Sequence, residues 1–334
     1  MKIFLIILLS VFINFKTASN NINIYARNYI VYDYNSEEIL EGKDYDKSYS
    51  VASISKIMTA IIALESDRLF DVITVDEVIK KVEGSSLYLS IGDEITLIDL
   101  VYGLLLRSGN DAAVLIASNI CKTIKEFVDL MNQKAREIKM ENTLFNNPSG
   151  LDIFDEGNLS SCLDMAKLMA YCLNNELFCQ IISTKYYKNP LKGVWTNKNR
   201  LLHQYEYCIG GKTGYTKKAR RTLVTCAEKD YQKLIVVTLD CGSDFSFHKN
   251  LYEHYFNNYQ YLVFLQEGKN YIDNYYIYSK KVVGLRINKD VKSGVKMYYL
   301  NPIDNTLLIK FILPDNQEEI VLEKEFEVYF YKSK

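Results

Sequence analysis

The chain has 334 residues, with 40 Lys or Arg against 41 Asp or Glu and a formal net charge of -1. A chain of this length can bury one large core or two smaller ones. Because the charges balance, the chain lacks the excess of positive charge that attracts the phosphates of a nucleic acid. We therefore expect no nucleic-acid partner. The histidines stand in no HExxH or HxH arrangement, which argues against a zinc peptidase, and the sequence implies no metal or organic cofactor.

The N-terminus has the layout of a secretory signal peptide. A basic start precedes an apolar run over residues 3–13, and small residues follow up to Ser19. The run is short for a membrane span, so we favour removal over retention as an anchor. We therefore expect a signal peptide at residues 1–19 and an exported protein, in the cell wall or at the outer face of the cytoplasmic membrane.

The cysteines give little sign of disulfides or of a metal site. There are seven, an odd number, so at least one is unpaired, and their spacing is not that of metal ligands. Cys162, Cys172 and Cys179 fall in a helix-like stretch, where we interpret them as buried small hydrophobic residues.

The first half of the chain predicts a strand hairpin followed by helices. Residues 22–40 alternate around a turn at residues 34–36, and we expect two strands that form an edge of a sheet. A helix-like segment covers residues 53–64. Residues 97–120 then predict two helices, interrupted at residues 107–110.

The middle of the chain is mostly helical before it turns to strands. Helices are predicted at residues 127–140 and 160–173, with a loop at 146–150 between them. β-Branched and aliphatic residues then predict antiparallel strands that complete the sheet, at residues 207–213, 222–227 and 233–239.

The C-terminal part predicts one more helix and then strands only. Residues 247–264 have a helical pattern, and short alternating strands follow at residues 282–287 and 306–311. The chain ends at residues 327–334 in what reads as a strand, not as an amphipathic helix, so membrane anchoring through the C-terminus is not supported.

Together these elements predict an α+β protein. Its parts are a signal peptide, a catalytic domain at residues 20–270, and a small β-rich C-terminal domain at residues 275–334. No Gly/Ser linker separates the two domains, and the sequence has no internal repeat.

The first chemical motif is Ser53-Ile54-Ser55-Lys56. Side chains three residues apart at the start of a helix project from the same face, so the amine of Lys56 can reach the hydroxyl of Ser53. A serine becomes a nucleophile when a neighbour takes its proton, and a lysine can do so when burial or a nearby cation lowers its pKa. We expect Lys212 to supply that cation.

Two further motifs follow in order, Ser108-Gly109-Asn110 on a turn and Lys212-Thr213-Gly214 on a strand. The turn can relay a proton and hold a substrate amide. The strand presents a charge and a hydroxyl to a carboxylate, and its glycine lets a substrate backbone approach. Each motif alone is weak. Their order and structural context make coincidence improbable, because together they match the signature of a serine acyl-transfer site.

These motifs resemble the penicillin-binding protein and serine β-lactamase superfamily, and in particular the low-molecular-weight D-alanyl-D-alanine carboxypeptidases. The resemblance covers roughly residues 22–265 and includes further blocks. It implies an antiparallel sheet flanked by helices with a helical subdomain. The similar blocks lie at residues 51–60, 84–88, 106–113, 145–152 and 199–202.

The resemblance also implies roles for individual residues. Ser53 would be the acylated nucleophile and Lys56 its base. Ser108 and Asn110 would form the second motif. The substrate-binding strand would contribute Lys212, Thr213, Gly214 and Tyr215, with the backbone amides of Ser53 and Tyr215 forming the oxyanion hole.

Two departures from the pattern concern the substrate side. Arg220 stands where relatives often have glycine. Relatives also commonly carry an arginine downstream of the Lys-Thr-Gly motif that helps to bind the terminal carboxylate, and here the nearest candidates are His248 and Lys249.

The function that this resemblance implies is removal of the terminal D-alanine from peptidoglycan stem peptides ending in D-Ala-D-Ala, with β-lactam antibiotics acylating the same serine. Three alternatives stay open. A DD-endopeptidase would use the same residues. A class A-like β-lactamase needs a Glu-x-x-Leu-Asn segment, and residues 141–145 come nearest but end in Phe. A non-catalytic wall-binding module would leave the three motifs without a purpose.

Overall fold

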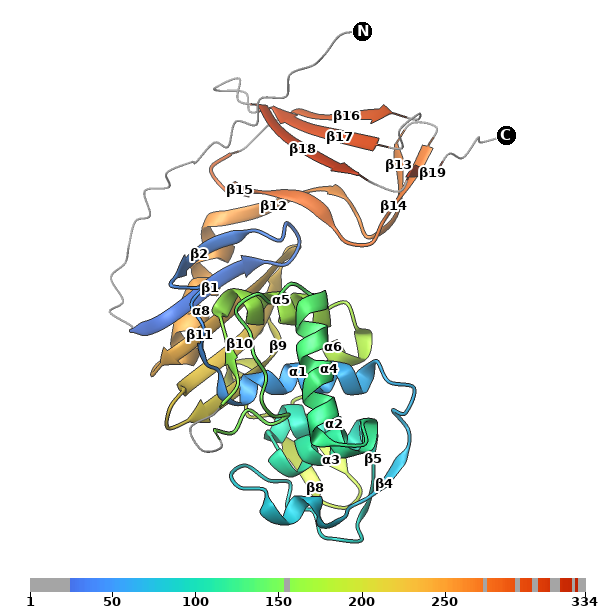
Figure 1. Cartoon of the computed structure of the whole chain (residues 1–334). Helices are drawn as coiled ribbons and strands as arrows, with labels where there is room; N and C mark the ends of the chain where they lie inside the picture. The colour runs from blue at the N-terminus through green and yellow to red at the C-terminus, as the bar shows by residue number, and fades with distance from the viewer. Residues whose placement is uncertain are drawn as a thin grey trace.

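The structure is a computed structural model, and it describes residues 25–152, 157–272, 275–291, 295–301, 306–312, 319–325 and 328–329. The signal peptide predicted at residues 1–19 lies outside the described residues. Figure 1 shows helices packed against one main sheet, with further strands at the C-terminal end of the chain. The α+β fold class predicted from the sequence is confirmed.

The main sheet has five antiparallel strands in the order β2-β1-β11-β10-β9. The predicted hairpin and the three later strands are confirmed, but the prediction that both hairpin strands lie at an edge was wrong for β1. This strand pairs with β2 on one side and with β11 on the other, so that Val31 lies opposite Val236. The strands are β1 (Ala26–Asp33), β2 (Ile39–Lys43), β9 (Cys208–Thr216), β10 (Arg220–Lys229) and β11 (Gln232–Cys241).

One face of this sheet is covered by a group of helices that enclose the largest apolar core. The central helix α1 (Lys56–Leu64) is buried along its whole length. A 3-10 segment, η1 (Ala52–Ser55), leads into it. The other helices of this group are α2 (Leu97–Tyr102), α3 (Asn110–Ile120), α4 (Ile124–Glu137), α5 (Cys162–Cys172) and α6 (Glu176–Ser183).

The opposite face of the sheet is covered by α8 (Asp244–Asn258), which packs with Tyr252 and Phe256 onto a second apolar cluster. The predicted helix at 247–264 was wrong at its C-terminal end. Residues Tyr259–Leu265 form strand β12, which is rich in aromatic and aliphatic residues and pairs with β15 (Val283–Asn288).

Short elements connect these layers. Between α2 and α3 the chain forms a π-helical segment, η3 (Gly103–Arg107). The remaining short elements are β3 (Tyr49–Ser50), β4 (Val72–Thr74), η2 (Glu77–Lys81), β5 (Glu94–Thr96), β6 (Leu159–Ser160), β7 (Tyr186–Asn189), β8 (Gly193–Thr196) and α7 (Arg200–Gln204).

The C-terminal strands form small sheets of their own. Their orders are β12-β15, β13-β14-β19 and β16-β17-β18. The β12-β15 sheet is tied to the main sheet by an ion pair between Arg286 of β15 and Asp33 of β1. The other strands are β13 (Gly268–Ile272), β14 (Tyr275–Ser279), β16 (Val295–Asn301), β17 (Thr306–Ile312), β18 (Glu319–Glu325) and β19 (Val328–Tyr329).

The domain boundary near residue 270 stays a prediction. Strand β12 precedes the predicted boundary and pairs with β15, which follows it. Of the terminal strand predicted at residues 327–334, Val328–Tyr329 forms β19, and residues 327 and 330–334 lie outside the described part of the chain.

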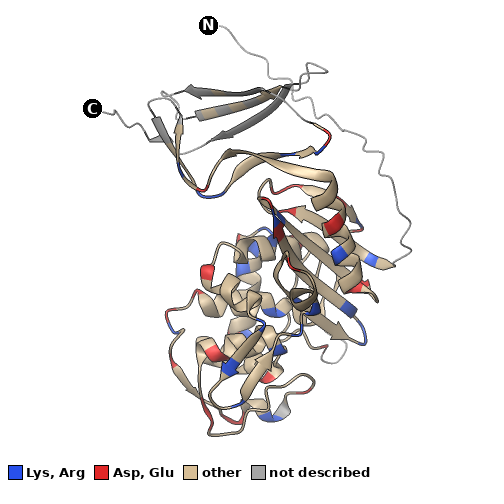
Figure 2. Cartoon of the chain, turned by 180° about the vertical axis from the view of Figure 1, so that it is seen from behind, with Lys and Arg blue, Asp and Glu red and all other residues tan. Residues whose placement is uncertain are grey.

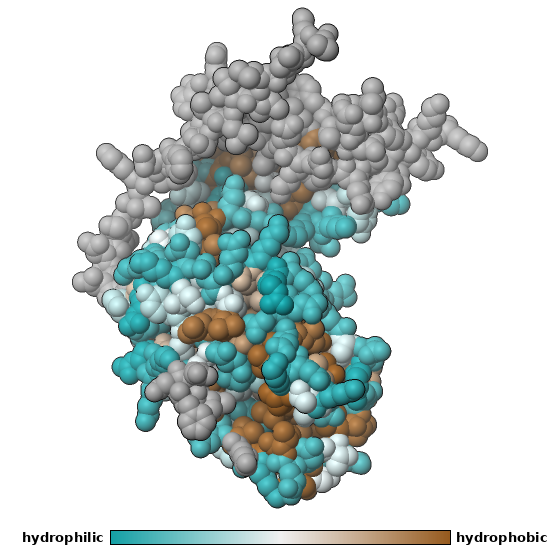
Figure 3. Space-filling model, in the orientation of Figure 1, coloured by the Kyte–Doolittle hydropathy of each residue, from teal (hydrophilic) through white to brown (hydrophobic). Residues whose placement is uncertain are grey.

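Acidic and basic residues are interspersed over the described surface (Figure 2), in keeping with the small net charge. In Figure 3, apolar residues reach the surface mainly in the lower, helical part of that face. All seven cysteines are free thiols: five are buried, and Cys121 and Cys179 are partly exposed. Within the described residues, no helix is long and apolar enough to span a bilayer.

Candidate active site

The first motif places the hydroxyl of Ser53 and the amine of Lys56 side by side. Ser53 lies in the 3-10 segment η1 and Lys56 opens α1, so the two side chains are almost eclipsed. The Nζ atom of Lys56 is 3.0 Å from the Oγ atom of Ser53. The two groups are therefore within direct proton-transfer distance.

The amine of Lys56 has two other partners, and both can only accept hydrogen bonds. It donates to Oδ1 of Asn110 at 2.6 Å and to the backbone carbonyl of Ser149. When the amine is neutral, its two N–H bonds can satisfy these acceptors. The lone pair then faces the hydroxyl of Ser53, which is the arrangement a general base requires.

The carbonyl of Ser149 belongs to a loop whose backbone amides donate hydrogen bonds to asparagine side chains. Oδ1 of Asn147 accepts from the amide of Gly150 at 2.7 Å, and Oδ1 of Asn158 accepts from the amide of Asn146 at 2.7 Å. The resemblance covers this loop, but sequence analysis gave it no role, because a backbone carbonyl has no signature of its own in the sequence.

The backbone around Ser53 is tightly packed. Ala52 has φ = 51° and Gly150 has φ = 75°. A Cβ atom at Gly150 would lie 2.0 Å from the carbonyl oxygen of Ala52. Glycine is therefore required at position 150 both for its conformation and for the contact.

The second motif lies where η3 ends and α3 begins. Ser108 adopts the left-handed conformation, with φ = 65° and ψ = 33°. Asn110 is anchored by its backbone amide to the carbonyl of Ser85 at 2.7 Å and by its side-chain Nδ2 to the carbonyl of Glu83 at 2.6 Å. The amide group of Asn110 is therefore fixed with its oxygen toward Lys56.

The third motif lies on the edge strand β9. Lys212 is buried and donates to Oγ of Ser108 at 2.9 Å and to the carbonyl of Thr213 at 2.7 Å. Gly214 comes close to the segment that carries Ser53, since a Cβ atom there would lie 3.0 Å from the amide nitrogen of Ser53. Tyr215 is exposed and lines the same pocket as Thr213 and Gly214. The structure thus brings all eight predicted site residues together.

Burial dominates the electrostatics of the two lysines. Burial lowers the pKa of Lys56 to about 7, with a further contribution from the charge of Lys198. Burial also lowers the pKa of Lys212, and the charges of Lys56 and Lys198 add to that effect. Lys212 was expected to be the cation that lowers the pKa of Lys56, but burial is the larger cause, and the contribution of Lys198 was not predicted.

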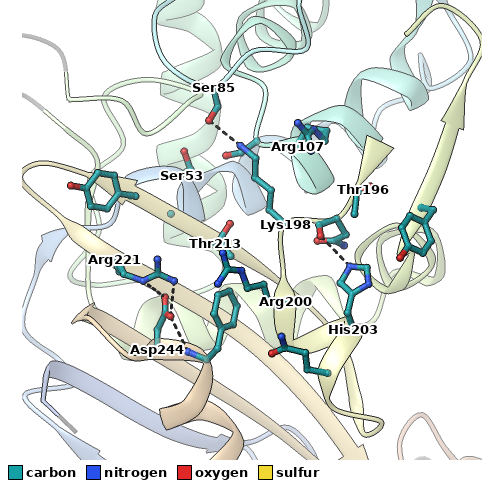
Figure 4. Close-up of a pocket in the computed structure, with 17 residues that line it drawn as sticks. Ser53, Ser85, Arg107, Thr196, Lys198, Arg200, His203, Thr213, Arg221 and Asp244 are labelled. Carbon is teal, nitrogen blue, oxygen red and sulfur yellow. Dashed lines mark hydrogen bonds and ion pairs between the residues drawn. The ribbon is translucent and has the colours of Figure 1, made fainter. Parts of the chain in front are cut away.

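These groups open into a pocket of about 800 Å³ (Figure 4). Among the described residues that line it are four cationic side chains that sequence analysis did not assign: Arg107, Lys198, Arg200 and Arg221. They come from η3, the segment after β8, α7 and β10, so no local pattern in the sequence connects them.

The two candidates for the carboxylate-binding cation were wrong. His248 is fully buried and bonded to Thr225 and Thr238, and the amine of Lys249 lies 5.8 Å from the ring centre of Tyr205. Neither lines the pocket.

Arg221 is the pocket cation downstream of the third motif. It pairs with Asp244 at 2.8 Å. The preceding Arg220 has φ = 58°, a conformation that favours glycine.

A family model described as D-alanyl-D-alanine carboxypeptidase matches residues 14–243. The chain belongs to this family. The resemblance seen in the sequence is therefore confirmed. Among the described residues of this family member, no cluster of three or more His, Cys, Asp or Glu could hold a metal ion.

Two curated relatives illustrate the similarity in sequence. The chain is 33% identical over 227 residues to the D-alanyl-D-alanine carboxypeptidase DacF of Bacillus subtilis, which covers 65% of this chain and 58% of that protein. It is 32% identical over 233 residues to DacC of Escherichia coli, with 66% and 57% covered. The alignment thus spans somewhat more than half the length of these relatives.

Solved structures extend the similarity beyond the catalytic region. The chain superimposes on penicillin-binding protein 5 of Haemophilus influenzae with a TM-score of 0.76 at 25% identity, covering 91% of this chain and 98% of the other. It superimposes on a Mycobacterium tuberculosis D-alanyl-D-alanine carboxypeptidase with a TM-score of 0.65 at 28% identity, covering 70% and 91%.

Proposed function

We propose that this family member is an exported serine DD-carboxypeptidase, which removes the terminal D-alanine of peptidoglycan stem pentapeptides and is acylated by β-lactams. The observation that carries the proposal is the amine of Lys56, which is 3.0 Å from the hydroxyl of Ser53 and has a pKa lowered to about 7. A lysine in this state can act as a base near neutral pH.

In the proposed reaction, Oγ of Ser53 attacks the carbonyl carbon of the penultimate D-alanine as Lys56 takes the hydroxyl proton. The amides of Ser53 and Tyr215 stabilise the developing oxyanion. Lys212 and Thr213 hold the substrate carboxylate. The peptide C–N bond breaks, the leaving amine receives a proton through Lys56 and Ser108, and water then hydrolyses the ester.

Two alternatives receive less support. Glu141, the nearest match to a β-lactamase glutamate, lines a separate pocket with Met140 and Thr143. Among the described residues that line the Ser53 pocket, Asp244 is the one carboxylate, and Arg221 pairs with it. A non-catalytic wall-binding module would not need a desolvated lysine next to a serine.

The test is D-alanine release from a diacyl-Lys-D-Ala-D-Ala peptide. We expect release by the wild-type protein and its loss in Ser53→Ala, together with loss of covalent labelling by a fluorescent penicillin. Stem-peptide binding that persists in Ser53→Ala, with no release by a folded wild type, would favour the binding module instead.

A further inference from the structure

Asp111 is a buried carboxylate that the reaction described above does not use. It lies in the first turn of α3, directly after Asn110, and only 3% of its surface is exposed. Within the described residues its partners are neutral donors: the hydroxyl of Ser86 at 2.6 Å and the amides of Leu87 and Ala112, both at 2.9 Å. Burying a charge without a cation costs free energy, so this position points to a role beyond packing.

The bonds of Asp111 fix a segment that has no regular secondary structure. Residues 83–87 lie between η2 and β5 and form neither helix nor strand. Besides the bonds to Asp111, the carbonyl of Ser85 accepts from the amide of Asn110 at 2.7 Å, and the carbonyl of Glu83 accepts from Nδ2 of Asn110 at 2.6 Å. Segment 83–87 is therefore fastened to the start of α3 by two consecutive residues.

Apolar packing completes this attachment. Leu87 is buried, and its side chain packs against Gly103 of η3 and Gly109 of the second motif. A Cβ atom at Gly109 would lie 2.7 Å from Cγ of Leu87, so a larger residue there would push Leu87 out of its place. The carboxylate of Asp111 holds the backbone amide of the same leucine, so both ends of the residue are fixed.

Asn110 links this segment to the reacting groups. Its Oδ1 accepts from the amine of Lys56 at 2.6 Å, which leaves the lone pair of the neutral amine for the hydroxyl of Ser53. Nδ2 of the same amide donates to the carbonyl of Glu83. A displacement of segment 83–87 would therefore turn the amide of Asn110 and move the amine of Lys56 with it.

The charge of Asp111 also opposes the cations around the amine of Lys56. The charge of Lys198 adds to the effect of burial and lowers the pKa of Lys56, whereas the charge of Asp111 raises it. Lys212 on β9 is buried beside the same amine, and Arg107 of η3 acts on Lys198. Among these described charges, that of Asp111 alone is negative.

We propose that Asp111 is a positioning residue for the acylation of Ser53. It fastens segment 83–87 to α3 and so keeps the amide of Asn110 in place against Lys56. Its negative charge offsets the cations around that amine. This inference rests on the proposed function, because it takes Lys56 as the base. Asp111 acts only through Asn110 and through its charge.

The test measures the rate of covalent labelling by a fluorescent penicillin from pH 5 to 9, with the full-length protein. Asp111→Asn keeps the shape of the side chain and removes its charge. We expect the plateau rate at high pH to fall by about 10- to 100-fold, because a displacement of about 1 Å can cost this much. We expect the pH of half-maximal rate to fall by roughly half a unit, because the charge that raises the pKa of Lys56 is lost.

Asp164→Asn is the matched control. Asp164 is likewise buried in the first turn of a helix, α5, and it accepts from the amide of Asn142 and the hydroxyl of Thr143. It does not belong to the described lining of the Ser53 pocket. Its replacement should lower the free energy of unfolding and reduce the labelled fraction, while the plateau rate and the pH of half-maximal rate stay at their wild-type values.

Ser86→Ala separates the attachment from the charge. It removes a hydroxyl that donates to Asp111 and keeps the carboxylate, so the plateau rate should fall while the pH of half-maximal rate stays in place.

An unchanged plateau rate in Asp111→Asn would overturn the inference, and so would a pH of half-maximal rate that stays in place or rises. If that variant gives no folded protein, Ser86→Ala decides, and a wild-type plateau rate there rejects the inference. A folded wild type that penicillin does not label would instead overturn the proposed function.

Discussion

Two buried polar clusters lie on opposite faces of the main sheet. On the face toward α8, His248 has its Nδ1 2.7 Å from the hydroxyl of Thr225 and its Nε2 2.9 Å from the hydroxyl of Thr238. On the face toward α1, Lys212 lies opposite Val224 in the sheet register and shares its buried environment with Lys56.

The difference between the clusters is charge, not burial. Burial lowers the pKa of His248 to about 3, so the ring is neutral at physiological pH and both of its nitrogens have hydroxyl partners. Lys56 is equally buried, but its pKa of about 7 lets it alternate between charged and neutral near neutral pH. The first cluster can only support the fold, whereas the second can move a proton.

Removal of the Lys56 amine is expected to have the largest effect of the changes considered below. We expect Lys56→Gln to slow acylation of Ser53 by about 10²–10⁴-fold, the usual contribution of a general base. The measurement is the rate of covalent labelling by a fluorescent penicillin. Lys125→Gln, on the exposed face of α4, is the control and should label at the wild-type rate. A variant at Lys56 that labels as fast as wild type would remove this lysine from the mechanism.

The second test replaces the histidine of the other cluster. His248→Leu leaves the hydroxyls of Thr225 and Thr238 without a ring partner in a buried site, so we expect a loss of about 1–3 kcal/mol in the free energy of unfolding. Denaturant unfolding measures this loss. Acylation per folded molecule should not change, and a displaced pH profile of acylation would contradict a purely structural role.

The smallest expected effect concerns the pH dependence. Because the base must be neutral, the acylation rate should rise with pH through about 7, the pKa of Lys56. The charge of Lys198 lowers that pKa, so Lys198→Met should raise it and move the profile to higher pH. Acylation rates measured from pH 5 to 9 would decide this, and a profile that stays in place or moves to lower pH would exclude Lys198 as a cause.

The sequence allowed the three motifs to be predicted because each is local. Ser53 and Lys56 are three residues apart, so the start of one helix is enough to bring them together. The fold class followed from residue patterns in the same way. By contrast, nothing in the hairpin sequence indicated that β1 would pair with β11, because that contact joins distant parts of the chain.

The cationic residues that line the pocket could not be predicted for the same reason. Arg107, Lys198 and Arg221 belong to three separate elements, and only the folded chain places them around one volume. The carbonyl of Ser149 is a backbone atom, and any residue type would supply it. His248 was selected for its distance along the chain, whereas α8 directs it toward the sheet.

The contact between Gly150 and Ala52 has a consequence for how the enzyme can evolve. The loop that carries the Ser149 carbonyl and the segment that carries Ser53 meet at Gly150 and Ala52, with the hydroxyl of Ser55 beside the contact. A side chain at position 150 would collide with the carbonyl of Ala52 and the hydroxyl of Ser55, and a change at Asn147 would remove the bond that holds the Gly150 amide. Sequence changes that keep this fold are therefore expected at the exposed rim of the pocket, whereas position 150 tolerates only glycine.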